Sequence, residues 1–175
     1  LYSGVTTVRT VGGVLDTDAK LRDEFAAGKT VGPRILAANE AVSVPGGHMA
    51  GSLAYIAENA DEARSLVARI AAGKPDLIKL MITGGVLDAT VKGEPGVLKM
   101  PSEYVRAACD EAHRLGLSVA AHVESPEGVR VALENGVDTI EHGAQADETI
   151  LALFRERRAA LITTLSPALP YALFD

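Results

Sequence analysis

A lysine stands at the centre of an apolar run. Lys79 lies within residues 77–82, a run rich in aliphatic side chains that stops at Thr83-Gly84-Gly85. The run has the length of a buried strand and is too short for a buried helix. Because an isolated charge is not tolerated in an apolar interior, we expect Lys79 to be neutralised, paired or chemically used.

Two later apolar runs each carry a histidine at or near their C-terminal end. Residues 118–122 end at His122, and residues 139–143 carry His142 just before a glycine. Alternate side chains on a strand point to the same face. If Lys79, His122 and His142 all point inward from three successive strands, the three side chains meet within several ångströms.

The chemistry of these side chains is that of a metal site. Two neutral imidazoles are good ligands for zinc and similar metals, whereas a lysine ammonium beside them would repel a cation. A lysine that has taken up carbon dioxide is instead an anionic carbamate, whose two oxygens can bridge two metals. Carbamate formation needs the neutral amine, and burial near cations depresses the pKa of a lysine. On this hypothesis Lys79 has a chemical use.

Residues beside these runs are candidates for supporting roles. His48 lies in a Pro-Gly-Gly-His loop on the expected active face and is a candidate for substrate contact, with plain exposure as the alternative. Gly84 and Gly85 allow a tight turn through which the backbone could approach a substrate, and turn geometry alone explains them equally well. Glu124 and Glu141 flank the histidines and could support metal ligands, although a salt bridge or solvent exposure is favoured for Glu141.

The elements that must position these residues alternate along the chain. We predict strands at 5–10, 33–38, 77–82, 118–122, 139–143 and 160–165, helices at 17–27, 59–73, 101–116, 125–136 and from Asp147, and long loops at 39–58 and 84–99. Such alternation means parallel strands with right-handed crossovers, and the nearly continuous apolar strands indicate a sheet covered on both faces. No Gly-x-Gly-x-x-Gly loop supports an open doubly wound sheet. Long loops after the strands suit the catalytic face of a barrel. We therefore predict an α/β fold: an incomplete TIM (β/α)₈ barrel covering strands two to seven, with residues 1–175 as part of a single domain.

Composition excludes several classes of partner. The 175 residues carry a net charge of −6 without any basic run, which argues against nucleic acid as a partner. No apolar stretch reaches the roughly 20 residues of a membrane span, so we expect no membrane partner. The single Cys109 excludes an internal disulfide or a cysteine metal cluster and is expected to be a core or half-buried thiol.

The chain begins at Leu1 and ends at Asp175 as an internal piece of a longer protein would. We expect a cytoplasmic location and a possible homo-oligomer.

Four motifs together resemble a known family. They are Leu-Ile-Lys-Leu-Met-Ile-Thr-Gly-Gly-Val around Lys79, Val-Ala-Ala-His-Val-Glu around His122, Thr-Ile-Glu-His-Gly around His142 and Pro-Gly-Gly-His48. The chain resembles the amidohydrolase superfamily along its whole length, more closely the imidazolonepropionase-like and Xaa-Pro dipeptidase-like members. The resemblance implies that Lys79 is carboxylated and bridges two divalent metals, with zinc expected. It also implies that His122 and His142 bind the second metal.

The resemblance further implies the reaction. A metal-activated water would hydrolyse an amide-type bond in a dipeptide or an N-acyl amino acid, and arylesters or lactones are also conceivable. The family's strand-one His-x-His and its strand-eight aspartate have no counterpart in this chain, and Asp175 lies too near the seventh strand to be that aspartate. We therefore expect the fragment by itself to be inactive.

Two other functions remain open. A Schiff-base lyase or aldolase would use Lys79 as a nucleophile, but it leaves the paired histidines unexplained. A non-catalytic, truncated barrel would fit the missing ligands.

Overall fold

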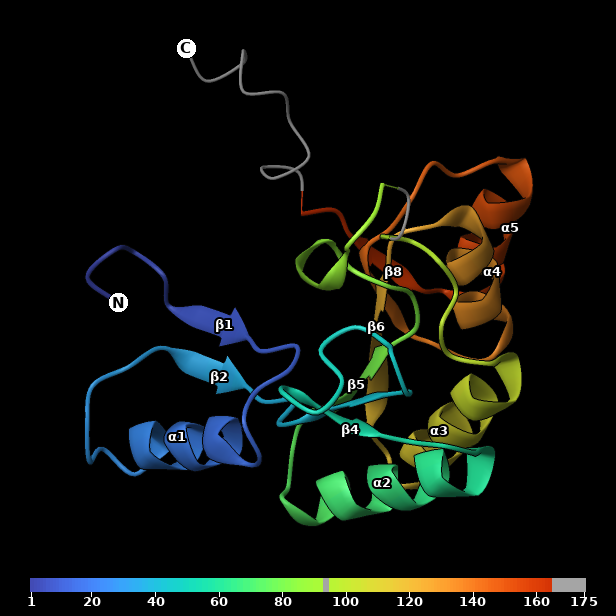
Figure 1. Ribbon diagram of the computed structural model, residues 1–175. Coiled ribbons are helices and arrows are strands. Elements are labelled where there is room, and N and C mark those ends of the chain that lie inside the picture. The colour runs from blue at the N-terminus through green and yellow to red at the C-terminus, as the bar shows by residue number, and fades with distance from the viewer. Residues whose placement is uncertain (93–94, 165–175) are drawn as a thin grey trace.

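The computed structural model describes residues 1–92 and 95–164 (Figure 1). The elements in chain order are β1 (Thr7–Arg9), α1 (Thr17–Ala26), β2 (Arg34–Leu36), β3 (Ala41–Ser43), β4 (Ala54–Ile56), α2 (Ala60–Ala72), β5 (Leu77–Met81), the 3₁₀ turn η1 (Val86–Asp88), α3 (Ser102–Arg114), β6 (Ser118–Val123), α4 (Pro126–Glu134), β7 (Thr139–His142), α5 (Glu148–Arg157) and β8 (Ala160–Ile162). The predicted alternation of strands and helices is confirmed except between α1 and α2, where the three short strands β2, β3 and β4 follow one another. The predicted end of the last strand, Leu165, lies outside the described residues, as does Asp175.

All pairs between the strands that the structure describes are parallel. One sheet has the order β4-β3-β5-β6-β7-β8, and β1 pairs with β2 in a second, two-stranded sheet. The segment from β2 to β3 runs between β1 and β5, because Asn39 accepts a bond from the Gly13 amide while Ala37 accepts one from the Asp76 amide. Helices α2 to α5 lie along one face of the curved sheet (Figure 1). This is the incomplete (β/α)₈ barrel that the alternation predicts.

The predicted loop at residues 39–58 is wrong in part, because it contains two short strands. Asn39 adopts a left-handed φ of 61° and divides one strand path into β2 and β3. The chain then turns through glycines and returns as β4, which pairs with β3 in parallel register. Three-residue strands separated by turns show no hydrophobic period, so sequence patterning has nothing to detect there.

The two faces of the sheet differ in chemistry. Alternate residues of β5, β6 and β7 (Ile78, Leu80, Val119, Ala121, Val123 and Ile140) pack against the apolar sides of α2 to α5 in the main core. Helices α2, α4 and α5 begin where capping residues predict: the side chains of Asn59, Ser125 and Asp147 each accept a hydrogen bond from an amide of the first turn. Helices α1 and α3 begin without such a side-chain cap. The opposite face carries the polar side chains together with small apolar clusters, which include Leu77 with Ala120 and Met81 with Ala41. Within the described residues, no helix has the length and apolarity needed to cross a membrane.

Asn39 joins three elements and generates a stability prediction. Its buried side chain accepts a bond from the Ala19 amide at 3.1 Å and donates one to the Gly73 carbonyl at 3.3 Å. Asn39→Gly keeps the left-handed backbone but leaves both groups without their partner, so we expect a loss of about 2 kcal/mol of unfolding free energy. Asn39→Ala adds backbone strain and should lose roughly 1 kcal/mol more.

Urea unfolding of the two variants measures this difference. Equal stability of the glycine and alanine variants would contradict the role of the backbone conformation. A loss below about 0.5 kcal/mol in both would contradict the role of the side chain.

Candidate active site

Strand register places Lys79 and His122 on the same face. Lys79 pairs with Ala120, and His122 pairs with Met81 on one side and with Glu141 on the other. Directly paired residues of a parallel sheet point to the same side, and this side is the one that faces away from the helices. The inner face therefore carries the ionisable groups of β5, β6 and β7.

Lys79 is the most unusual group on this face. The residue is 2% exposed, and its ammonium nitrogen has no hydrogen bond or ion pair with any part of the chain that the structure describes. Burial lowers the pKa of Lys79 from 10.5 to about 7; the nearby Glu141 carboxylate opposes this shift, and Arg9 adds to it. Near neutral pH a large share of the amine is therefore uncharged, as carbamate formation requires.

An ion pair crosses the inner face beside Lys79. Arg9 on β1 donates to the Glu141 carboxylate at 2.6 Å and to the Thr139 hydroxyl at 3.0 Å. Thr139 in turn donates to Glu141 at 3.2 Å, so the carboxylate is bound twice. The contact with Arg9 confirms the salt bridge favoured for Glu141. Its side chain is 5% exposed, which rules out solvent exposure. Since Arg9 neutralises Glu141, the carboxylate is not free to form a pair with the Lys79 ammonium.

His142 reaches the site by a turn rather than by alternation. Glu141 points to the inner face, so a regular strand would direct the next side chain toward the helices. His142 instead has a φ of 68°, and the Gly143 amide donates to the Glu141 carbonyl at 2.9 Å. This is a γ-turn, a strained conformation for a non-glycine residue. The turn brings the His142 ring to within 4.8 Å of the His122 ring, measured between centroids.

In each of these two rings, one nitrogen donates a hydrogen bond to an oxygen atom, and this bond determines which nitrogen carries the proton. His122 Nε2 donates to the Gly84 carbonyl at 3.1 Å, which leaves Nδ1 with its lone pair. The Thr164 hydroxyl donates to the Ile162 carbonyl and therefore accepts from His142 Nδ1 at 2.9 Å, which leaves Nε2 with its lone pair. Such outer contacts are typical of histidines that bind metals.

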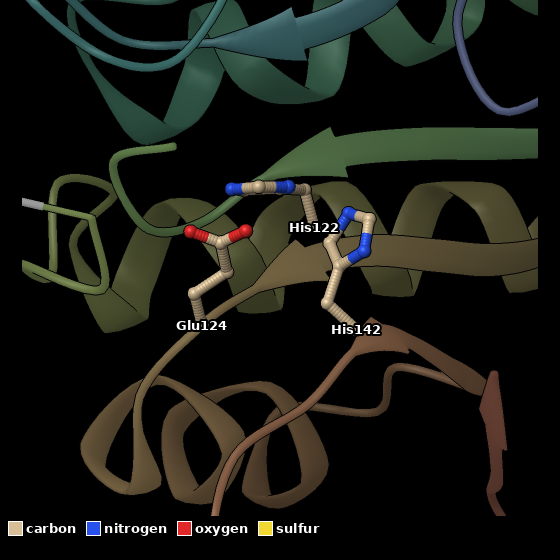
Figure 2. A group of neighbouring side chains, drawn as sticks. All are labelled: His122, Glu124 and His142. Atoms are coloured by element: carbon tan, nitrogen blue, oxygen red, sulfur yellow. The ribbon is translucent and has the colours of Figure 1, made fainter. Parts of the chain in front are cut away.

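Electrostatics also favour neutral rings. Burial lowers the pKa of His122 to about 3, although its bond to Gly84 opposes the shift. Burial also lowers the pKa of His142, and the charge of Lys79 adds to the effect. Both rings are thus unprotonated near neutral pH and can donate lone pairs. Ligand atoms of His122, Glu124 and His142 all lie within 4.8 Å of one another, and the three side chains face one another (Figure 2). These residues fit a divalent metal.

The predicted substrate-contact residues lie next to this cluster. His48 stacks on the His122 ring with centroids 4.2 Å apart, and its Nδ1 pairs with the Asp88 carboxylate. A Cβ at Gly85 would lie 2.4 Å from the His48 ring, so this close approach requires glycine. Gly84 contributes its carbonyl to His122. The structure thus brings His48, Gly84 and Gly85 to the edge of the cluster, and contact with substrate remains a prediction.

Sequence reasoning missed three contributors. Arg9 ends the short strand β1, in which only Val8 is apolar, so its charge is a weaker signal than that of Lys79. Asp88 and Thr164 lie in irregular segments, and only the fold brings them to His48 and His142. No sequence pattern identifies such partners.

Comparison with known proteins gives the class of the chain. The model of the amidohydrolase family matches residues 1–167. The structure of a candidate prolidase from Bifidobacterium longum has 45% identity and a TM-score of 0.81, and the match covers 95% of this chain and 41% of that one. A Xaa-Pro dipeptidase with bound methionine has 33% identity and a TM-score of 0.84, covering 94% and 43%. Ochratoxinase from Aspergillus niger is 26% identical, with 95% of this chain and 38% of the enzyme covered.

The chain therefore belongs to the amidohydrolase family. It spans about two fifths of the length of these relatives. The resemblance seen in the four motifs and the predicted incomplete barrel are both confirmed.

The Arg9–Glu141 pair generates a stability prediction. Arg9→Met leaves the Glu141 carboxylate buried without its partner, so we expect the unfolding free energy to fall by roughly 3 kcal/mol. Arg9→Met/Glu141→Gln should recover part of this loss. The surface pair Arg130–Asp147 supplies the control, because Arg130→Met should cost less than about 1 kcal/mol. Chemical unfolding gives the coupling energy, and additive effects of the two inner substitutions would contradict the prediction.

The shifted pKa of Lys79 predicts a pH-dependent stability. Between its folded value of about 7 and its ordinary value of 10.5, the unfolded chain holds a proton that the folded chain lacks. Stability therefore rises with pH in this window, by up to about 1.4 kcal/mol per unit. Lys79→Met removes the free-energy cost of burying and deprotonating the amine. Without metal and CO₂, the variant should therefore be more stable than the parent at pH 7. The difference in unfolding free energy should shrink toward pH 10. Unfolding curves at several pH values measure it, with the exposed Lys29→Met as control. A difference that does not change with pH would contradict the assigned burial of the amine.

Proposed function

We propose that the whole protein is a metal-dependent hydrolase that cleaves an amide-type bond, with a carboxylated Lys79 bridging two metals. The observation that carries the proposal is a buried lysine, unpaired within the described residues, on the same face of the sheet as two histidines whose pKa values its charge lowers. Divalent metals at such a site lower the pKa of a water molecule toward 7 and polarise a carbonyl. Zinc is the metal that this ligand set favours.

Lys79 would act by changing its charge. The neutral amine forms an N–C bond with carbon dioxide and releases a proton, so a cationic side chain becomes an anion with two ligand oxygens. The low pKa of Lys79 supports this reaction at neutral pH. Arg9 supports it as well, because it binds Glu141 and so removes the carboxylate that would otherwise retain the ammonium form.

His122 and His142 would bind the second metal through His122 Nδ1 and His142 Nε2, the nitrogens that their hydrogen bonds leave open. The remaining ligands and the general base would come from outside these residues, since the relatives are more than twice as long as this chain. The amidohydrolase family and the two histidines both favour this reaction over Schiff-base chemistry on Lys79.

We propose a dipeptide or an N-acyl amino acid as the substrate. This follows from the relatives, which include a Xaa-Pro dipeptidase and a prolidase complexed with N-methylphosphonate-L-proline, at 33% and 29% identity. His48 would lie against the bound substrate, because its ring covers one side of His122 at the edge of the cluster.

Metal analysis and hydrolysis assays of the whole protein test the proposal. We expect about two metals per chain, activity on a panel of Xaa-Pro dipeptides or N-acyl amino acids, and loss of activity on chelation. Lys79→Ala should lose metal at one or both positions and reduce hydrolysis to background, while Lys29→Ala should retain both properties.

Unchanged metal content and activity in Lys79→Ala would refute the proposal. Trapping of substrate on Lys79 by borohydride would favour the Schiff-base alternative instead.

A further inference from the structure

A carboxylate completes the cluster formed by His122 and His142. Glu124 follows β6 two residues after His122, and its side chain turns back toward both rings (Figure 2). A ligand oxygen of Glu124 lies within 4.8 Å of the ligand nitrogens of both histidines. The motif resemblance assigns metal binding to the histidines and to Lys79, and it gives no such role to this residue.

The backbone of Glu124 is held in place from two sides. The buried Thr83 hydroxyl accepts a bond from the Glu124 amide at 3.0 Å and donates to the Gly84 carbonyl at 3.0 Å. On the other side, Gly96 approaches so closely that a Cβ there would lie 2.5 Å from the Glu124 carbonyl oxygen. The side chain therefore starts from a fixed point at the end of β6.

The Glu124 carboxylate nevertheless has no partner in the part of the chain that the structure describes. Within the residues that the structure describes, neither oxygen makes a hydrogen bond or an ion pair. The nearby His48 directs its Nδ1 to Asp88 instead. A half-buried carboxylate beside two neutral imidazoles is unfavourable unless a cation joins the group.

We propose that Glu124 is a metal ligand, and that His122, Glu124 and His142 together bind one divalent cation without help from Lys79. The inference deepens the proposed function, on whose metal site it rests. Two imidazoles and a carboxylate form an established three-ligand set for zinc that leaves one position open. Neighbouring ligand atoms of a tetrahedral zinc site lie about 3.3 Å apart, so modest side-chain rotations close the observed spacing.

The consequence is an order of assembly. If the three residues suffice for one ion, the second metal can bind before Lys79 is carboxylated. That cation then lowers the cost of the negative charge that forms when the amine adds carbon dioxide.

Zinc titration of the whole protein, stripped of metal and bicarbonate, tests this inference. Lys79→Ala should still bind one Zn²⁺ per chain. Lys79→Ala/Glu124→Gln should bind that ion at least about 10-fold more weakly. Lys79→Ala/Glu127→Gln is the matched control, because Glu127 is exposed three residues further along, and it should bind as Lys79→Ala does. Far-UV circular dichroism checks that each variant is folded.

Cobalt supplies a second readout that does not depend on the double variant. Co²⁺ bound to Glu124→Gln alone should show a d–d absorption spectrum different from that of the parent, whereas Glu127→Gln should not.

The outcomes separate this inference from the proposed function. Loss of all zinc in Lys79→Ala would overturn the independent three-residue site and leave the hydrolase intact. Unchanged zinc affinity and cobalt spectrum in the Glu124→Gln variants would overturn it too, and a raised KM alone would then place Glu124 against substrate. Retention of two zinc ions by Lys79→Ala would refute the bridging lysine, while the Glu124→Gln comparison would still decide the role of Glu124.

Discussion

The site depends on one constraint, the burial of an amine on the inner face of a parallel sheet. The outer face of β5, β6 and β7 is filled by aliphatic side chains that pack under the helices, so every ionisable group of these strands has to face inward. Lys79 is 2% exposed there, and the nearby Glu141 carboxylate is paired with Arg9. Removal from water lowers the pKa of the lysine to about 7, although the Glu141 carboxylate opposes the shift. An ordinary basic side chain is thereby converted into a nucleophilic amine.

Backbone geometry solves the second problem, which is to bring two histidines together from adjacent strands. His122 and Glu141 occupy the same row of the sheet, so a histidine at the next position of β7 points the wrong way by alternation. The γ-turn at His142 reverses that direction at a cost in backbone strain of order 1–3 kcal/mol. Strain of this kind persists where the surroundings fix it, and the bonds from Gly143 to Val123 and from His142 to Thr164 do so here.

Much of the fold could be predicted from the sequence because its signals are local. Capping residues, glycine stops and apolar runs placed the helices and the four strands from β5 to β8. The break at Asn39 could not be predicted, since it follows from bonds to Ala19 and Gly73, which are distant in the sequence. The site residues divide in the same way. Lys79 and His122 could be predicted from the sequence, because each is a polar residue in an apolar run. The pairings of Arg9 and Thr164 exist only once the strands are adjacent.

The ion pair between Arg9 and Glu141 has a consequence for how the molecule is made. The two residues are 132 positions apart, so the pair can form only after the intervening βα units have closed around it. Closing so long a loop costs conformational entropy that local contacts must first offset. During synthesis and collapse both charges therefore stay hydrated, and the desolvation penalty arises late, when the partner is already in reach. We therefore expect a long-range ion pair of this kind to slow unfolding and to contribute little to the folding nucleus.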